Sequence, residues 1–211
     1  MEILFIRHGE TLANTKNYYY GFTDSPMTER GKEQARAAGL VVNKMKFHAD
    51  KIYISERSRT RDTLELMGFK SNIASVDGRI NEQNLGKLEC MTYQEIEKKY
   101  PEVFREWNQD YHGYRVPEGE SHMDLYERVV DFLEDLIRME KGYNRKILVV
   151  SHGGVMASIY TYIIGGNMNY RNSAYFSNCA VLKTRLMSDQ LVIEALFNPE
   201  EIVKIAKDLK V

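Results

Sequence analysis

Two histidines follow apolar segments that have the composition of β-strands. His8 stands next to Arg7 at the end of the apolar run that begins at Met1, and His152 directly follows Lys146–Ser151. In α/β proteins the carboxyl ends of strands open into the crevice where ligands bind. An arginine there can hold an anion, and an imidazole can act as a nitrogen nucleophile. We therefore expect His8 and His152 to belong to one site.

The residue types around these histidines suit phosphoryl transfer. Two guanidiniums, from Arg7 and Arg59, and one protonated imidazole would neutralise a phosphoryl dianion, while a second, neutral imidazole attacks phosphorus in line. Phosphoryl transfer requires mainly positioning and charge stabilisation, so this set suffices without a metal. A glycine follows each histidine and would let backbone N–H groups approach an oxyanion. A structural or helix-capping role is the alternative for either histidine taken alone.

The remaining histidines and the cysteines carry no metal-ligand pattern. His48, His112 and His122 are scattered, without the spacing of a zinc motif, and we interpret them as surface or lid residues. Cys90 and Cys179 are isolated and are expected to be free thiols. The sequence therefore predicts no metal site and no cofactor.

Composition favours one ordinary globular domain over residues 1–211. Hydrophobic residues make up 43% of the chain, charged residues 28%, and the net charge is −1. A nucleic-acid partner, which needs a clustered basic face, is not expected, and neither is a membrane-spanning segment. The first residues enter a strand pattern without the features of a signal peptide, so we expect a cytoplasmic protein. Nothing in the sequence decides the oligomeric state.

The order of elements predicts an α/β fold with a mostly parallel central sheet and helices on both faces. The expected strands are residues 3–7, 51–55, 146–151, 178–187 and 190–197. Helical spacing of apolar residues follows the capping residues Thr28 and Ser121, and further helices are expected over residues 153–165 and from Asn198–Pro199. Residues 86–119 fit this alternation poorly. They contain short helical patterns over 93–100 and 101–109, and we interpret them as an insertion beside the site.

Aromatic residues gather in two segments that would border the pocket. Tyr18, Tyr19 and Tyr20 precede Gly21, and the insertion contributes the only tryptophan, Trp107, together with Tyr111 and Tyr114. These side chains could form an apolar wall for the organic part of a substrate. Ordinary packing of surface-loop aromatics is the alternative.

An ordered set of motifs extends over most of the chain and resembles the histidine phosphatase superfamily, also called the phosphoglycerate mutase-like family. The matching segments are Arg7-His8-Gly9-Glu10-Thr11 with Asn14, Gly21 to Gly31 (with Met27 for the usual Leu), Ser55-x-x-x-Arg59-x-x-x-Thr63 (with Thr60 for the usual Ala), Glu82-x-x-x-Gly86-x-x-Glu89, Pro117-x-Gly119-Glu120-Ser121 and Ser151-His152-Gly153. Cys90 stands where the family commonly has glycine.

The resemblance implies a role for each matching residue. His8 would be the nucleophile that becomes phosphorylated, with Arg7, Arg59 and His152 as the phosphate clamp. Glu82 would protonate the leaving oxygen and then activate water. Further phosphate contacts are implied for Asn14, Gly21 and the backbone of Gly153. The family fold, a mostly parallel sheet flanked by helices, agrees with the pattern of elements.

Reading the residues alone leaves rivals for three of these roles. Arg57 lies in the same basic cluster as Arg59. Asn14 could be a turn residue. Glu10, Glu89 and Glu120 compete with Glu82 as the acid.

Three functions are compatible with this set: a phosphatase for small phosphorylated metabolites, a phosphoglycerate mutase, and a phosphate-binding module without catalysis. The third is disfavoured because every implied catalytic residue is present. Cofactor-dependent mutases have E-R-x-Y-G after the acid and a downstream arginine pair for the substrate carboxylate. This chain has Glu82-Gln83-Asn84-Leu85-Gly86, and Glu106-Trp107-Asn108 where a basic pair would be expected. We therefore favour a phosphatase of the broad-specificity or α-ribazole type, with a preference for apolar or aromatic leaving groups.

Overall fold

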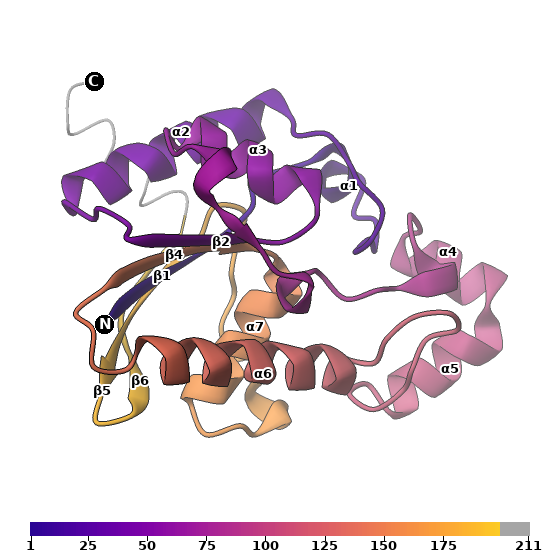
Figure 1. Ribbon diagram of the computed structural model, residues 1–211. Coiled ribbons are helices and arrows are strands. Elements are labelled where there is room, and N and C mark those ends of the chain that lie inside the picture. Colours follow the sequence, from indigo (N-terminus) through magenta and orange to yellow (C-terminus); the bar gives the residue numbers. More distant parts are fainter. Residues whose placement is uncertain (199–211) are drawn as a thin grey trace.

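The centre of the computed structural model, which describes residues 1–198, is a six-stranded sheet in the order β3-β2-β4-β1-β5-β6 (Figure 1). The strands are β1 (Glu2–Arg7), β2 (Lys51–Ile54), β3 (Ser75–Val76), β4 (Lys146–Ser151), β5 (Val181–Met187) and β6 (Gln190–Phe197). The first four strands are parallel, and β5 and β6 are antiparallel additions at one edge. The predicted α/β fold with a mostly parallel sheet is confirmed. The sequence did not predict β3, and three strand ends differ: β1 begins at Glu2, β2 ends at Ile54, and β5 begins at Val181 rather than Asn178.

The register of β1 and β4 brings the two histidines to one edge of the sheet. These strands pair in parallel from Glu2 opposite Lys146 to Arg7 opposite Ser151. The inner residues of both strands are buried, as expected where helices cover both faces of a parallel sheet. His8 and His152, the residues that follow, therefore leave adjacent strands at the same end.

Helices cover both faces of the sheet (Figure 1). On one face lie α2 (Glu29–Lys44) and α3 (Ser58–Leu66), and on the other lie α6 (His122–Glu140) and α7 (Gly153–Ile163). The predicted capping residues are confirmed, since the side chains of Thr28 and Ser121 accept hydrogen bonds from backbone N–H groups in the first turns of α2 and α6.

The predicted insertion forms a small unit at one end of the sheet (Figure 1). It contains α4 (Tyr93–Lys99) and α5 (Pro101–Gln109), which pack around a separate apolar cluster that includes Trp107. The shorter helical segments are α1 (Leu12–Thr15) and the 3₁₀ turns η1 (Ser71–Ile73), η2 (Gly78–Ile80), η3 (Gly86–Leu88) and η4 (Met168–Tyr170).

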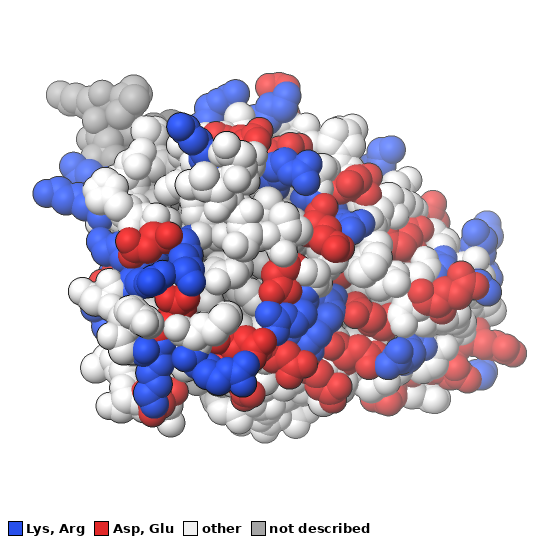
Figure 2. All heavy atoms as spheres, viewed as in Figure 1, with Lys and Arg blue, Asp and Glu red and all other residues white. Residues whose placement is uncertain are grey.

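The surface mixes charges of both signs. On the face shown in Figure 2, basic and acidic side chains are interspersed, in keeping with the net charge of −1. Among residues 1–198, no helix has the length and apolar character needed to span a membrane. The helix expected from Asn198–Pro199 lies outside the described residues.

Candidate active site

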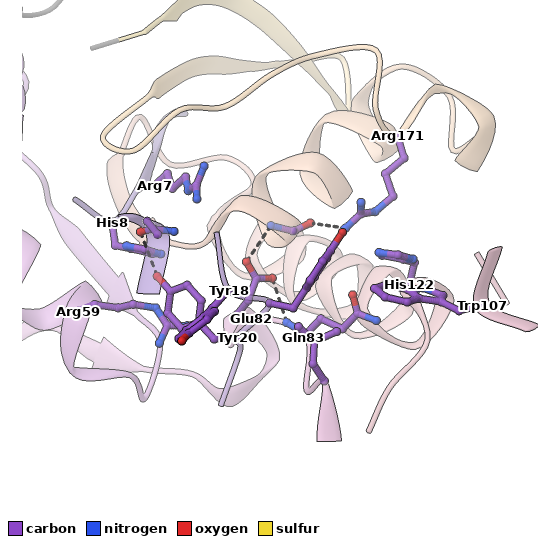
Figure 3. A pocket seen from close by; sticks show the side chains of 14 residues that line it. Arg7, His8, Tyr18, Tyr20, Arg59, Glu82, Gln83, Trp107, His122 and Arg171 are labelled. Carbon is purple, nitrogen blue, oxygen red and sulfur yellow. Dashed lines mark hydrogen bonds between the residues drawn. The ribbon is translucent and has the colours of Figure 1, made fainter. Parts of the chain in front are cut away.

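A pocket of about 230 Å³ opens at the carboxyl ends of β1 and β4, between the sheet and the insertion (Figure 3). Its walls combine basic, amide and aromatic side chains with one carboxylate. The lining residues are Arg7, His8, Asn14, Tyr18, Tyr19, Tyr20, Arg59, Glu82, Gln83, Leu85, Trp107, His122, Gly154 and Arg171. The pocket therefore contains five of the predicted site residues: Arg7, His8, Asn14, Arg59 and Glu82.

His8 is held as a neutral imidazole with a defined tautomer. Its Nδ1 lies 2.8 Å from the carbonyl oxygen of Gly9, and since a carbonyl only accepts, Nδ1 carries the proton. Burial lowers the pKa of His8 well below 6.5, and the positive charges of Arg59 and Arg7 lower it further. Nε2 consequently remains unprotonated at neutral pH, the state that a nucleophile requires.

Two arginines, Arg59 buried and Arg7 partly buried, supply positive charge next to this imidazole. Arg7 donates from Nη1 to the carbonyl of Phe176 at 2.6 Å, while its buried Nε has no partner among the described residues. Arg59 is only 1% exposed and donates through Nη1 and Nη2 to the carbonyls of Thr23 and Gly21, at 3.1 and 2.7 Å. Each guanidinium has N–H groups left beyond these bonds, so both can hold an oxyanion in the pocket.

The amide of Asn14 is oriented by its neighbours. Its Oδ1 accepts hydrogen bonds from the backbone N–H of Thr11 at 3.0 Å, from the Tyr20 hydroxyl at 3.1 Å and from the Asn178 amide at 3.2 Å. With the oxygen engaged in this way, the Nδ2 amide hydrogens remain as the donors of this side chain. Asn14 is thus suited to give a neutral hydrogen bond to a phosphoryl oxygen.

Glu82 lies between the two ends of the pocket, and its carboxylate is fixed by backbone groups (Figure 3). Oε1 accepts the N–H of Gln83 at 2.9 Å, and Oε2 accepts the N–H of Gly154 at 3.0 Å. A larger residue at position 154 would displace this carboxylate, because a Cβ there would lie 2.3 Å from Oε1 of Glu82. The start of α7 therefore positions this carboxylate.

His152 lies behind the pocket wall. Its ring centroid is 5.3 Å from that of His8, so the two histidines converge as the sequence suggested. Its Nδ1 accepts from Nε of Arg59 at 3.1 Å, and Nε2 consequently donates to Oγ of Ser55 at 2.7 Å. In this arrangement His152 orients Arg59, and its direct contact with phosphate stays a prediction.

The two glycines predicted to contact phosphate have other neighbours. The N–H of Gly21 donates to the carboxylate of Glu89 at 2.9 Å, and its carbonyl accepts from Arg59. Gly21 thus helps to place Arg59, and its contact with phosphate stays a prediction. Gly153 leaves room for Arg7, whose Cζ would lie 3.3 Å from a Cβ at that position.

The rivals of Arg59 and Glu82 are engaged outside the pocket lining. Arg57 donates to the carbonyl of Phe22 at 2.9 Å and pairs with Glu56. Glu89 accepts backbone N–H groups, including that of Thr23 at 3.1 Å, and so supports a loop. The other two rival acids are also paired, because Glu120 bonds to Arg128 and Glu10 accepts from the Thr28 hydroxyl.

Some of the aromatic residues line the pocket, and one of them also packs against Arg59. Tyr18, Tyr19 and Trp107 line the pocket, as the sequence suggested for a substrate-binding wall. Tyr20 also borders it, but its ring lies against the Arg59 guanidinium at 4.7 Å. Tyr111 and Tyr114 are not among the lining residues.

Three polar side chains that line the pocket, those of Arg171, His122 and Gln83, had no predicted role in it. Arg171 comes from the segment after α7, and no motif or periodicity marks it. His122, interpreted above as a surface or lid residue, is instead 6% exposed, because the insertion covers the start of α6. Gln83 follows the acid directly, and this position beside Glu82 was the one available signal.

Among the described residues, no group of three or more His, Cys, Asp or Glu side chains is arranged to hold a metal ion. The positive charge available in the pocket comes from its arginines.

Known proteins share both the sequence pattern and the fold. The sequence matches the histidine phosphatase superfamily (branch 1) over residues 3–199. It is 33% identical to phosphoserine phosphatase 1 of Hydrogenobacter thermophilus, over 80% of this chain and 79% of that protein. The identity to 6-phosphofructo-2-kinase/fructose-2,6-bisphosphatase of Gallus gallus is also 33%, over 77% of this chain but 32% of that longer protein. The crystal structure of the alpha-ribazole phosphatase from Shigella flexneri has the same fold, with a TM-score of 0.85 at 24% identity over 94% of this chain and 97% of that one.

Proposed function

Because this chain belongs to the histidine phosphatase superfamily, branch 1, we propose that it hydrolyses phosphomonoesters of small metabolites through a phosphorylated His8. The observation that carries this proposal is the state of His8, which combines an Nδ1–H bonded to Gly9 with a pKa held below its ordinary value. An imidazole in this state presents a free electron pair at Nε2, next to two guanidiniums.

In the first step, Nε2 of His8 forms a bond to phosphorus while the bond to the leaving oxygen breaks. Arg7, Arg59 and Asn14 hold the phosphoryl oxygens, whose negative charge the two guanidiniums compensate. Glu82, protonated at this stage, gives its proton to the leaving oxygen, so the alcohol departs neutral. This step needs no metal ion as a source of positive charge.

In the second step, water replaces the alcohol. Glu82, now a carboxylate, accepts a proton from the water as its oxygen attacks phospho-His8. The bond from Nε2 to phosphorus breaks, and inorganic phosphate leaves with the imidazole neutral again. The same carboxylate serves both steps because it lies between the imidazole end and the leaving-group end of the pocket (Figure 3).

A phosphoglycerate mutase remains the second candidate, and one observation favours keeping it. The sequence lacks the arginine pair expected at Glu106-Trp107-Asn108, yet Arg171 provides a cation in the pocket from another segment. A substrate carboxylate could therefore be held while the phosphoryl group returns to a second oxygen.

One assay separates the two candidates. The protein is incubated with 3-phosphoglycerate, with and without a bisphosphoglycerate primer, and both 2-phosphoglycerate and free phosphate are followed. A phosphatase releases phosphate, with or without primer, faster than it isomerises the substrate. Fast isomerisation with little free phosphate would establish the mutase instead. Activity that disappears in EDTA and returns with a divalent metal would contradict catalysis by arginine and histidine alone.

A further inference from the structure

The end of the pocket away from His8 contains two buried donors without partners. Nε of Arg171 and Nε1 of Trp107 are both inaccessible to solvent and have no hydrogen-bond partner among the described residues. Both side chains line the pocket and are 6% and 4% exposed, respectively. Buried polar groups are nearly always hydrogen-bonded in folded proteins, so two unpaired donors on side chains of one wall are available to the acceptors of a ligand.

The guanidinium of Arg171 is also short of a counter-ion. Its one side-chain hydrogen bond among the described residues is a long contact of 3.4 Å from Nη2 to the carbonyl of Gly154. Glu82 acts on it electrostatically but forms no ion pair with it, and the carboxylate of Glu82 is held by backbone N–H groups. A guanidinium stays protonated in proteins, and a buried cation is costly unless it is paired. In Figure 3, Arg171, His122, Trp107 and Gln83 lie on the side of Glu82 opposite His8 and Arg59. That is the side where a leaving group would lie.

From these unpaired donors we infer that the leaving group carries a carboxylate, which binds between Arg171 and Trp107. The inference rests on the proposed function, since the phosphoryl group must occupy the His8 end. It also replaces the preference for apolar leaving groups that the aromatic pattern suggested. Trp107 offers a hydrogen-bond donor as well as an aromatic ring face. A purely apolar leaving group would leave both this N–H and the guanidinium of Arg171 without a partner.

The other two polar residues of this subsite favour a carboxylate over a second phosphate. Nδ1 of His122 donates to the carbonyl of Tyr111 at 2.7 Å, so its Nε2 is an acceptor. Burial and, as a smaller cause, the charge of Arg171 lower the pKa of His122 to about 3, so the ring is neutral. Gln83 donates Nε2 to the carbonyl of Glu120 at 2.9 Å, which leaves Oε1 as its free acceptor. These two acceptors add no positive charge, so the single guanidinium matches the charge of a carboxylate and not that of a phosphate dianion. The acceptors can instead receive hydrogen bonds from an ammonium or hydroxyl group of the same leaving group.

The size of the pocket agrees with this class of substrate. A volume of about 230 Å³ lies below the range typical of pockets for drug-sized ligands. It suits a phosphoryl group on a short carboxylic acid, such as a phosphorylated hydroxy or amino acid of three carbons.

The test compares two substrates that differ in the carboxylate alone. Phosphoserine and phosphoethanolamine share the phosphate, the carbon chain and the ammonium group, so the ratio of their kcat/KM values isolates the carboxylate. We expect the wild type to favour phosphoserine and Arg171→Met to reduce this ratio by on the order of 10- to 100-fold. Trp107→Phe, which removes the N–H and keeps an aromatic ring, should reduce it by a smaller factor. Arg138→Met, at an exposed arginine of α6 paired with Asp135, is the matched control and should leave the ratio unchanged.

Binding to an inert protein separates this inference from the proposed function. In His8→Ala, calorimetric titration with phosphoserine and phosphoethanolamine measures the subsite without turnover, and the double variant with Arg171→Met should lose the preference for phosphoserine. Equal affinities in His8→Ala, or equal losses of kcat/KM for both substrates in Arg171→Met, would overturn the carboxylate subsite. The second result would mean that Arg171 acts through Glu82. Absence of phosphate release from both substrates, with selective binding intact, would instead count against the proposed hydrolase.

Discussion

At the scale of single residues, the chemistry depends on protonation states that the surroundings impose. His8 is neutral because burial and two guanidiniums oppose a further positive charge. Glu82 is oriented by two backbone N–H groups, and Asn14 by an oxygen that is already engaged. As a result, the groups left to act on a substrate are Nε2 of His8, the carboxylate of Glu82 and the amide hydrogens of Asn14.

The contribution of Glu82 should depend on the leaving group. An alkoxide needs a proton to depart and a nitrophenolate does not, so Glu82→Gln should slow phosphorylation of His8 far more for alkyl phosphates. General acid catalysis is commonly worth roughly 10² to 10⁴ in rate. Single-turnover rates are the required measurement, because the same group also assists dephosphorylation. Equal losses for both substrates would mean that another group provides the proton.

Cys90 has a backbone conformation that is unfavourable for a residue with a side chain. The backbone at this position has φ +61°, a left-handed conformation that costs a residue with a Cβ about 1–2 kcal/mol. Glycine avoids this cost but loses more conformational entropy on folding, so its net advantage is smaller. We expect Cys90→Gly to raise the free energy of unfolding by roughly 0.5–1 kcal/mol in urea titrations. Cys90→Ala keeps the strained Cβ and should give no such gain. A gain of the same size in Cys90→Ala would point to the thiol instead.

At the scale of elements, the site is assembled where β1, β4 and α7 meet. The paired strands deliver His8 and His152 to one edge, and the first turn of α7 supplies the N–H that holds Glu82. The position of the Glu82 carboxylate therefore depends on close contact between the loop that contains Glu82 and the start of α7.

This contact predicts the effect of adding one methyl group. In Gly154→Ala the new Cβ would lie 2.3 Å from Oε1 of Glu82 and 3.0 Å from a methyl carbon of Leu125, so the carboxylate must move. We expect kcat/KM for alkyl phosphates to fall by about 10- to 100-fold, a part of what general acid catalysis supplies. Gly78→Ala is a suitable control, because its nearest neighbours would lie at an ordinary 3.7 Å. Unchanged turnover in Gly154→Ala would show that Glu82 needs no such positioning.

Some of these elements could be predicted from the sequence and others could not. Long apolar runs next to polar residues indicated β1 and β4, and their pairing follows from a parallel sheet, so the approach of His8 and His152 was predictable. The strand β3 has two residues, both exposed, and therefore no hydrophobic period to detect. Arg171 lies in an irregular segment that only tertiary packing brings to the pocket. The same holds for His122. The capping residue Ser121 predicted the start of the helix, but not that the insertion would cover it.

At the scale of the whole molecule, three buried imidazoles link stability to pH. Burial lowers the pKa values of His8, His152 and His122, so the folded protein binds fewer protons than the unfolded chain below pH 6.5. Stability is therefore complete above the unfolded pKa and is lost as the pH falls below it. Each such histidine contributes a slope of about 1.4 kcal/mol per pH unit in that range.

Urea titrations between pH 7.5 and 5 measure this slope. The wild type should lose stability steeply below pH 6.5, and His122→Gln should reduce the slope by about one histidine, or 1.4 kcal/mol per pH unit. His48→Gln, at an exposed position, should leave it unchanged. A slope that does not differ between wild type and His122→Gln would contradict a neutral, buried His122.

The most direct measurement of the central claim is the identification of the phosphorylated residue during turnover. A reaction with a phosphomonoester substrate is quenched in base, where a phosphohistidine survives, and the digested protein is mapped by mass spectrometry. We predict a phosphoryl group on Nε2 of His8, an adduct that acid removes, and none in His8→Ala, which should also be inactive. Full activity in His8→Ala, or a phosphoryl group on a different residue, would contradict it.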